Sequence, residues 1–186
     1  LAKIAEDKRQ AKLAEEKRLA KIAEDKRQAK LAEEKRLAKI VEEQRLLADQ
    51  GDASAQAYLG GEYFLGESVP QDYAKALKWY RLAADQGYAN AQFLLGAMYQ
   101  DGRGVPQDDV EAVKWYRLAA DQGNANAQFN LGRMYHSGRG VPQDHAEAVK
   151  WYRLAADQGY ANAQFYLGSM YQDGRGVPQD DVEAVK

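Results

Sequence analysis

The sequence predicts an all-α fold in which one long helix precedes an array of repeated helix pairs. Three observations predict it. First, the tripeptide Asp-Gln-Gly recurs at a constant spacing of 36 residues, with its glycines at Gly51, Gly87, Gly123 and Gly159. Second, the units between these glycines each contain two stretches with the apolar periodicity of a helix. Third, the residues before Gly51 include no glycine or proline, the residues that most often interrupt a helix.

Composition narrows the class of protein. The chain has 186 residues, of which 45% are hydrophobic and 29% charged, as expected for a compact domain. It has no cysteine, which excludes disulfides and thiol chemistry. Residues 1–46 hold 14 basic and 10 acidic side chains, and residues 47–186 hold 12 and 18. Because acids accompany every basic pair, we expect no nucleic-acid partner. No apolar run reaches the roughly 20 residues of a membrane helix, so we expect no membrane insertion.

The first 50 residues predict a single charged helix. Residues 1–18 are repeated without change at 19–36, and the pattern continues into Gly51. Alanine, leucine, lysine and glutamate favour helix strongly, and about 50 residues would span roughly 75 Å. Its end, 45–51, matches the "RLAADQG" that closes each later unit. The chain therefore divides into a helix at 1–50, merging into the first helix of the array, and repeats at 51–186.

Lateral self-association of this helix is favoured over an isolated rod. Eighteen residues equal five helical turns, so every eighteenth residue returns to the same side. The apolar stripes are sparse, and Leu13 and Leu31 lie on a different side from the main one. The seven residues predicted to form the contact are Leu1, Ile4, Ala11, Leu19, Ile22, Leu37 and Ile40.

Each repeat is predicted to be a pair of helices. Three complete units occupy 52–87, 88–123 and 124–159, and a partial unit occupies 160–186. In the first helix of the second unit, apolar residues lie at helical spacing, as at Ala91, Leu95 and Met98. The second helix ends at Gly123, where a residue in the left-handed conformation commonly stops a helix. Because the chain begins with Leu1 and ends inside a repeated segment, we expect it to be a segment of a longer protein.

The segment "DGRGVPQDD" at 101–109 has two interpretations. Glycines beside an arginine at a helix start could bind phosphate, or they could connect two helices. A phosphate loop normally occurs once, after a strand, and ends in Lys-Ser or Lys-Thr. This segment recurs at 36-residue intervals without that ending. We therefore predict a connector in which Gly102 ends one helix and Asp108 caps the next.

The recurring residues are A-x-A-Q-x-x-L-G-x-x-Y-x-x-G, then V-P-Q-D, then A-x-K-W-Y-x-x-A-A-x-Q-G. This pattern, present in four copies over 51–186, closely resembles the Sel-one-like repeat family, a relative of the tetratricopeptide repeats. The resemblance implies an α-solenoid of stacked antiparallel helix pairs that acts as an adaptor or assembly scaffold, most often in bacteria. Some cysteine-rich members are linked to β-lactam or cell-wall chemistry, but their cysteine pairs are missing here.

No residue pattern predicts catalysis, a cofactor or a metal. His136 and His145 occupy different repeat positions and are interpreted as surface histidines. Trp79, Trp115 and Trp151 recur in "KWYR" and are interpreted as inter-repeat core rather than a stacking surface. The paired aspartates that start the second helices lack the further oxygen ligands that calcium requires.

Variation among the copies predicts a partner-binding groove. Three positions of the first helix, spaced i, i+3 and i+7, change from copy to copy, and an asparagine extends their face by one turn. A face that tolerates such change is not packed in a shared core. The predicted groove residues are Tyr58, Gly61, Asn90, Leu94, Ala97, Asp101, Asn126, Asn130, Arg133, Asn162, Tyr166 and Ser169.

The favoured function is a non-catalytic scaffold whose repeats bind a partner protein, while the long helix joins or spaces its copies. The alternative to a protein partner is self-assembly through the long helix or the open end of the array. An engineered fusion of a rigid helix to repeats would also give an unchanged 18-residue duplication. A cell-envelope enzyme would need convergent polar groups, which the copies do not show. The family resemblance alone favours the bacterial periplasm or envelope.

Overall fold

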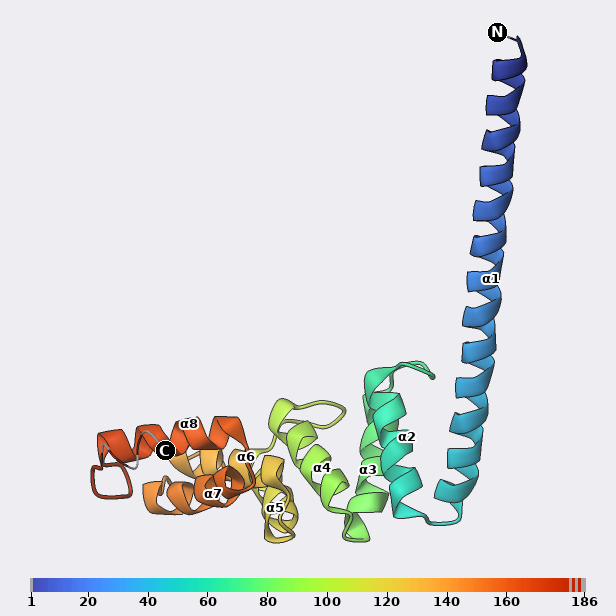
Figure 1. Cartoon of the computed structure of the whole chain (residues 1–186). Coiled ribbons are helices and arrows are strands. Elements are labelled where there is room, and N and C mark those ends of the chain that lie inside the picture. Colours follow the sequence, from blue (N-terminus) through green and yellow to red (C-terminus); the bar gives the residue numbers. More distant parts are fainter. Residues whose placement is uncertain (1, 181, 183, 185–186) are drawn as a thin grey trace. The chain divides into compact units, whose positions relative to one another are not determined.

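The structure is a computed structural model that describes residues 2–180, 182 and 184. These residues form helices and connecting turns, and they contain no strand. The helices are α1 (Ala2–Asp49), α2 (Ala53–Leu65), α3 (Tyr73–Asp85), α4 (Ala89–Asp101), α5 (Asp109–Asp121), α6 (Ala125–Ser137), α7 (His145–Asp157) and α8 (Ala161–Asp173). The chain forms two compact units, 1–43 and 44–186, and Figure 1 shows the helix order within each. The predicted all-α fold is confirmed.

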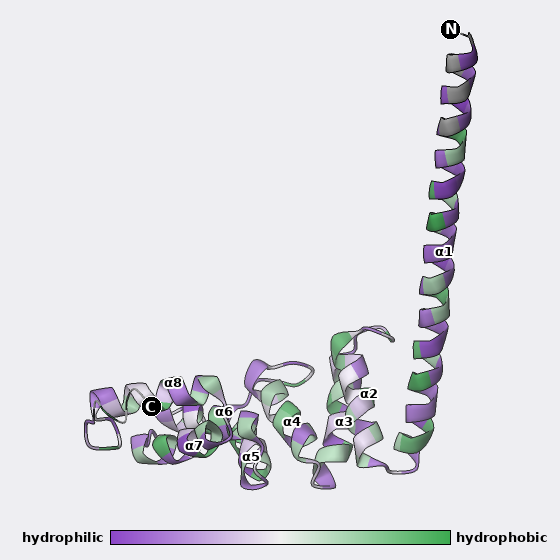
Figure 2. Ribbon diagram, viewed as in Figure 1, coloured by the Kyte–Doolittle hydropathy of each residue, from purple (hydrophilic) through white to green (hydrophobic). Residues whose placement is uncertain are grey.

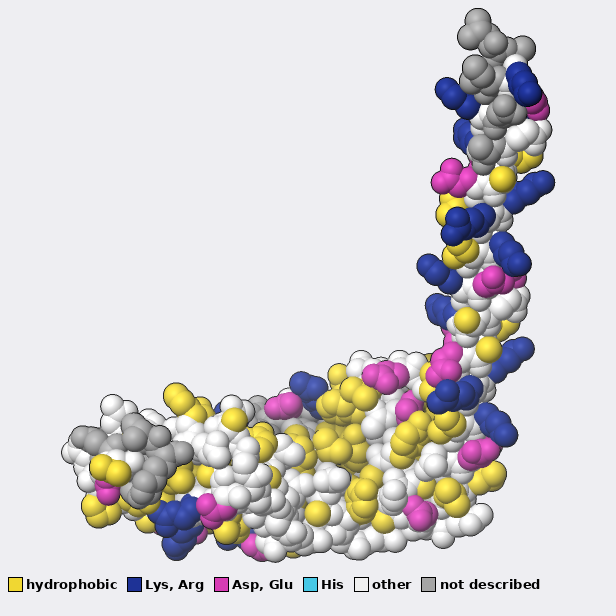
Figure 3. Space-filling model, in the orientation of Figure 1, with side chains coloured by type: hydrophobic (Ala, Val, Ile, Leu, Met, Phe, Trp, Pro, Cys, Tyr) yellow, Lys and Arg dark blue, Asp and Glu magenta, His cyan; other side chains and the backbone are white. Residues whose placement is uncertain are grey.

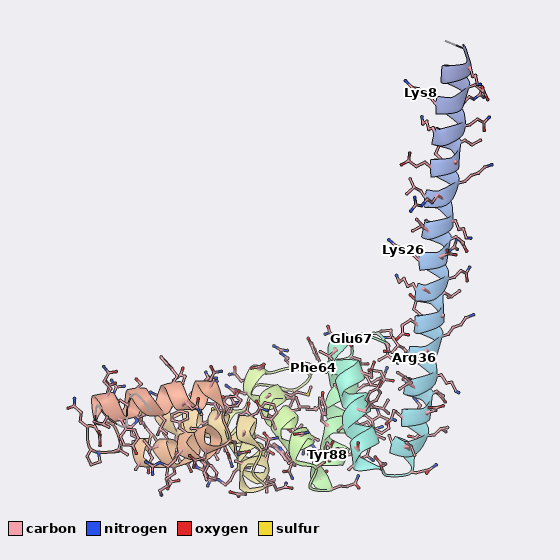
Figure 4. The ribbon with its side chains drawn as sticks, viewed as in Figure 1. Lys8, Lys26, Arg36, Phe64, Glu67 and Tyr88 are labelled. Atoms are coloured by element: carbon pink, nitrogen blue, oxygen red, sulfur yellow. The ribbon has the colours of Figure 1, made fainter. Side chains whose placement is uncertain are left out.

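The first unit is a single straight run of helix, as the sequence predicts. Lys8 and Lys26, 18 residues apart, project from the same side of α1 (Figure 4), as five full turns require. The ion pairs along it are exposed, as in Lys30–Glu34 at 3.8 Å, so each contributes little stability. Charged side chains of both signs alternate with small apolar patches along its visible surface (Figure 3).

The predicted contact residues of α1 do not form one strong apolar stripe. Leu19 and Ile22 are 58% and 40% exposed, and Leu13 and Leu31 on the other side are both 43% exposed. Hydrophobic turns are interspersed with hydrophilic ones along the helix (Figure 2). Leu1 and the side chains of Ile4 and Ala11 lie outside the described residues. Self-association of α1 therefore stays a prediction.

The second unit is a series of packed helix pairs. Helix α2 packs on α3, α4 on α5 and α6 on α7, and each second helix also packs on the first helix of the following pair. A glycine in the first helix allows close approach within each pair. A Cβ atom built on Gly60 would lie 2.5 Å from the Tyr80 ring, and one on Gly96 would lie 2.8 Å from the Tyr116 ring. The glycine of "LG" therefore accommodates the buried tyrosine of "KWY".

Caps at both ends set the helix lengths. The side chains of Asp72, Asp108 and Asp144 each accept a hydrogen bond from the backbone N–H three residues later, at 2.9–3.0 Å. These bonds satisfy donors that the first turn of a helix leaves open. A glycine ends each first helix: at the C-terminal end of α4, Gly102 has φ of 69°, in the left-handed region. The capping and helix-stop roles predicted for Asp108 and Gly102 are confirmed.

The second glycine of the connector explains why this segment recurs. A Cβ on Gly104 would lie 2.5 Å from the carbonyl oxygen of Tyr73, and one on Gly140 would lie 2.2 Å from that of Asp109. Each carbonyl belongs to the first residue of the second helix, α3 or α5, of the preceding repeat. The connector thus packs against the neighbouring repeat rather than surrounding an open anion site. In the first repeat, 52–87, Ser68 replaces this glycine. The residue equivalent to Tyr73 would be at position 37, which lies inside α1 rather than at a helix start.

A buried glutamine joins successive repeats. The side-chain amide of Gln92 donates to the backbone oxygen of Ala84 at 3.1 Å, and its oxygen accepts from Gln122 of the same repeat at 2.7 Å. Gln56 makes the same bond to Ala48 at 3.1 Å. Residues 44–49 therefore act as the end of a second helix, as the match to "RLAADQG" predicts.

The prediction of tryptophans in the core between repeats is confirmed for Trp115, whereas Trp79 and Trp151 are half-buried. Trp115 is 9% exposed and packs in a core cluster with Tyr80, Leu95 and Met98, so it bridges consecutive repeats. Its indole N–H donates to Glu111 at 3.1 Å.

Candidate functional site

The predicted groove positions range from exposed to half-buried, and three of them, Leu94, Ala97 and Tyr166, pack against the core. In α6, Asn126 and Arg133 are exposed and Asn130 is half-buried, whereas Ala127, Leu131 and Met134 of the same helix are buried. The residues of the variable face recur at the spacing of one side of a helix. On α6, the face that carries Asn126, Asn130 and Arg133 is therefore distinct from the face that carries Ala127, Leu131 and Met134.

The remaining groove residues differ in exposure. Asn90, Asp101, Asn162 and Ser169 are exposed, whereas Tyr58, Gly61, Leu94, Ala97 and Tyr166 are half-buried. The variable face is therefore less exposed at its positions in α2 and in the middle of α4. The face also contacts the next repeat, where the amide of Asn124 donates to the side-chain oxygen of Asn90 at 2.8 Å.

A hollow of about 270 Å³ lies on this side of the array, formed by parts of α4, α6, α7 and α8. Among the residues that line it are Gln100, Arg133, His136, Arg139, Tyr152 and Tyr166. Two of these, Arg133 and Tyr166, belong to the predicted groove. The lining contains two arginines and one histidine and no acidic side chain, although the chain as a whole has a net charge of −2.

The two arginines of the hollow differ in their pairing. Arg139 is held by Asp109 in a two-pronged bond, with Nε donating at 3.1 Å and Nη2 at 2.8 Å. Its charge is therefore balanced within the protein. Arg133 is exposed and lies with its guanidinium carbon 5.9 Å from the centre of the Phe129 ring. Among the described residues no carboxylate forms an ion pair with Arg133.

The hydroxyl of Tyr152 is buried without a hydrogen-bond partner among the described residues. The equivalent hydroxyl of the preceding repeat, that of Tyr116, donates to the side-chain oxygen of Gln100 at 2.6 Å. In the third repeat His136 replaces this glutamine. Burial raises the pKa of the Tyr152 hydroxyl, so the group stays protonated and remains a donor at neutral pH.

The prediction of two surface histidines is wrong. His136 and His145 are half-buried, their ring centres lie 5.2 Å apart, and the Nδ1 atom of each is buried with no partner among the described residues. Burial lowers the pKa of His136, and His145 and Arg175 lower it further. His136 is therefore neutral at pH 7. The two positions are unrelated within the repeat, but the end of α6 and the start of α7 bring them together.

A larger hollow, of about 470 Å³, lies between α5 and the connector residues Gly140 and Val141 of the following repeat, and was not predicted. Val110 and Leu118 of α5 line it and are 53% and 47% exposed. Leucine also recurs at the equivalent positions Leu82 and Leu154, 39% and 47% exposed. The recurrence of this leucine in "RLAADQG" is the sequence signal from which the hollow could have been predicted.

Within the described residues, no three His, Asp or Glu side chains lie close enough together to hold a metal ion. No helix there is both long and apolar enough to cross a membrane.

The family assignment rests on the repeats. The Sel1 repeat matches four consecutive segments, at residues 53–88, 89–124, 125–160 and 161–186. The chain belongs to the Sel1 repeat family. Sel1 repeat proteins are typically non-catalytic scaffolds for protein interaction. The comparison with curated proteins finds no match.

Solved Sel1 repeat structures resemble the array. A protective antigen of uropathogenic Escherichia coli is 48% identical, with a TM-score of 0.76 over 77% of this chain and 31% of that one. A Sel1 repeat protein from Oxalobacter formigenes is 37% identical, with a TM-score of 0.70 over 74% of this chain and 55% of that one. An immunity protein from Pseudomonas aeruginosa is 27% identical, with a TM-score of 0.53 over 80% of this chain and 55% of that one. The chain thus spans about a third of the first and just over half of the second.

Proposed function

We propose that this Sel1 repeat chain is a scaffold that binds a partner protein along the variable face of its first helices. One observation carries the proposal: on α6, the variable residues Asn130 and Arg133 are half-buried and exposed, while Ala127, Gln128 and Leu131, which all four copies share, are buried. Repeat arrays use such extended faces to bind proteins. The asparagines, the arginine and the serine of this face suit hydrogen bonding to a peptide backbone.

Peptide selection tests this function. We expect peptides selected on the full chain from a displayed random library to lose at least tenfold in affinity when Asn126→Trp fills the proposed face. The matched control is Lys78→Trp, which places the same bulk at an exposed position of a second helix. If the selected peptides respond to Lys78→Trp and not to Asn126→Trp, the binding face lies on the second helices, and the proposal is wrong.

We further propose that α1 joins copies of the chain through the side that carries Leu19 and Ile22. Both side chains are exposed in the single chain, and sparse apolar stripes at helical spacing support weak association. Light scattering is expected to give a dimer or larger for the full chain and a monomer for the Leu19→Glu, Ile22→Glu variant. Leu31→Glu, at a 43% exposed leucine on another side, is the control and should leave the mass unchanged. A monomeric parent chain would assign α1 as a spacer instead.

A further inference from the structure

We propose that the hollow between α4, α6, α7 and α8 binds a side-chain carboxylate of an acidic residue in the partner, with Arg133 and the Tyr152 hydroxyl as its principal donors. This inference rests on the proposed function, since the hollow shares Arg133 and Tyr166 with the proposed binding face. It adds the chemical class of the group that is recognised there.

The first argument is the charge of the hollow. Asp109 balances Arg139, Asp101 is paired with Arg103 at 3.3 Å, and no carboxylate among the described residues forms an ion pair with Arg133, which therefore supplies the positive charge of the hollow. One positive charge matches a singly charged carboxylate better than a phosphate group with about two negative charges. The planar guanidinium can also bind both oxygens of a carboxylate at once.

The second argument is the unpartnered Tyr152 hydroxyl. A buried donor without an acceptor is destabilising, and the preceding repeat avoids this with Gln100. A carboxylate oxygen would supply the acceptor that His136 does not. The bond of Tyr116 occupies the side-chain oxygen of Gln100, so the amide nitrogen of Gln100 is a further donor at the same hollow.

The geometry also specifies how the carboxylate reaches the hydroxyl. Arg133 and Tyr152 line the same hollow as Gln100, which accepts the bond from the Tyr116 hydroxyl. The hydroxyl oxygen of Tyr152 is itself buried. Contact therefore requires a rotamer change at the rim, and Arg133 is an exposed, flexible side chain there. In the complex the guanidinium and the hydroxyl bind the same carboxylate.

The experiment is an NMR titration of the full chain with three probes: N-acetylglutamate N-methylamide, its glutamine analogue and inorganic phosphate. We expect saturable shifts of the amides at 133–139 with the glutamate probe, with a Kd on the order of 1 mM, and at least tenfold weaker binding of the other two probes. Arg133→Gln and Tyr152→Phe are each expected to weaken binding about tenfold or more. Arg153→Gln, whose side chain donates to Tyr171 outside the hollow, should bind as the parent does.

Two variants separate binding from folding. Tyr152→Phe removes only an unpartnered hydroxyl, so it should not destabilise the fold. His136→Gln restores the residue that partners the tyrosine in the preceding repeat. It is expected to raise the melting temperature and to weaken glutamate binding about tenfold, because the hydroxyl is then occupied.

Several outcomes would overturn the inference. Glutamate binding that survives Arg133→Gln or Tyr152→Phe would remove the assigned donors, and equal binding of phosphate would remove the carboxylate selectivity. Selected peptides provide the separate check on function. If they respond to Asn126→Trp but carry no acidic residue and ignore Arg133→Gln, the binding face stands and the carboxylate site falls. If no selected peptide responds to Asn126→Trp, the proposed function itself fails.

Discussion

Gly60→Ala is expected to lower the free energy of unfolding of the repeat unit by up to about 2 kcal/mol. The added Cβ would lie 2.5–2.9 Å from three ring atoms of Tyr80, which is only 2% exposed and cannot move into solvent. Forcing an extra carbon into a packed core costs about 1–3 kcal/mol. The gain of about 1 kcal/mol in helix propensity from glycine to alanine offsets only part of this cost. Urea unfolding followed by tryptophan fluorescence measures the difference.

The adjacent glycine provides the control. Gly61 lies in the same helix, and the only atom near a Cβ built there is the Tyr80 hydroxyl, at an ordinary contact distance of 3.6 Å. Gly61→Ala should therefore stabilise the chain by up to about 1 kcal/mol. Equal effects from the two substitutions would show that close packing on Tyr80 is not what requires glycine at position 60.

The repetition made most of the fold predictable from sequence. Because the same residues recur every 36 positions, the helix pair could be inferred from three complete copies. The helix-stop role of Gly102 and the capping role of Asp108 follow from local backbone chemistry that involves only nearby residues. Both roles were therefore accessible without the tertiary structure.

The features that escaped prediction depend on contacts between repeats. The sequence shows that Gly104 recurs, but only the structure shows the Tyr73 carbonyl that it packs against. Similarly, His136 and His145 occupy unrelated repeat positions, and their contact arises where α6 and α7 are connected. Of the two main donors of the candidate carboxylate site, only one was predicted from the sequence. Arg133 stood out as a variable residue, whereas Tyr152 recurs in each complete repeat and is unusual only because its partner has changed.

Gln128→Leu is expected to destabilise the array by about 2 kcal/mol. Gln128 is 4% exposed; its amide donates to the Ala120 carbonyl at 3.1 Å and its oxygen accepts from Gln158 at 2.8 Å. Leucine has a similar volume but can make neither bond. The Ala120 carbonyl keeps the bond that it accepts from the Gly123 N–H at 2.9 Å, so the substitution removes two side-chain hydrogen bonds. Each lost bond costs about 0.5–1.5 kcal/mol.

The fourth repeat offers the same substitution in a different environment. Gln164 occupies the equivalent position in α8 but is exposed, and its amide lies 3.4 Å from the Ala156 carbonyl. Gln164→Leu should change the free energy of unfolding by less than about 0.5 kcal/mol, because water can replace the lost bond. Since each repeat in such an array is stabilised mainly by its neighbours, the difference between the two variants measures the coupling across one interface. If both glutamines cost the same, the bond contributes through the local helix end and not through the packing of one repeat on the next.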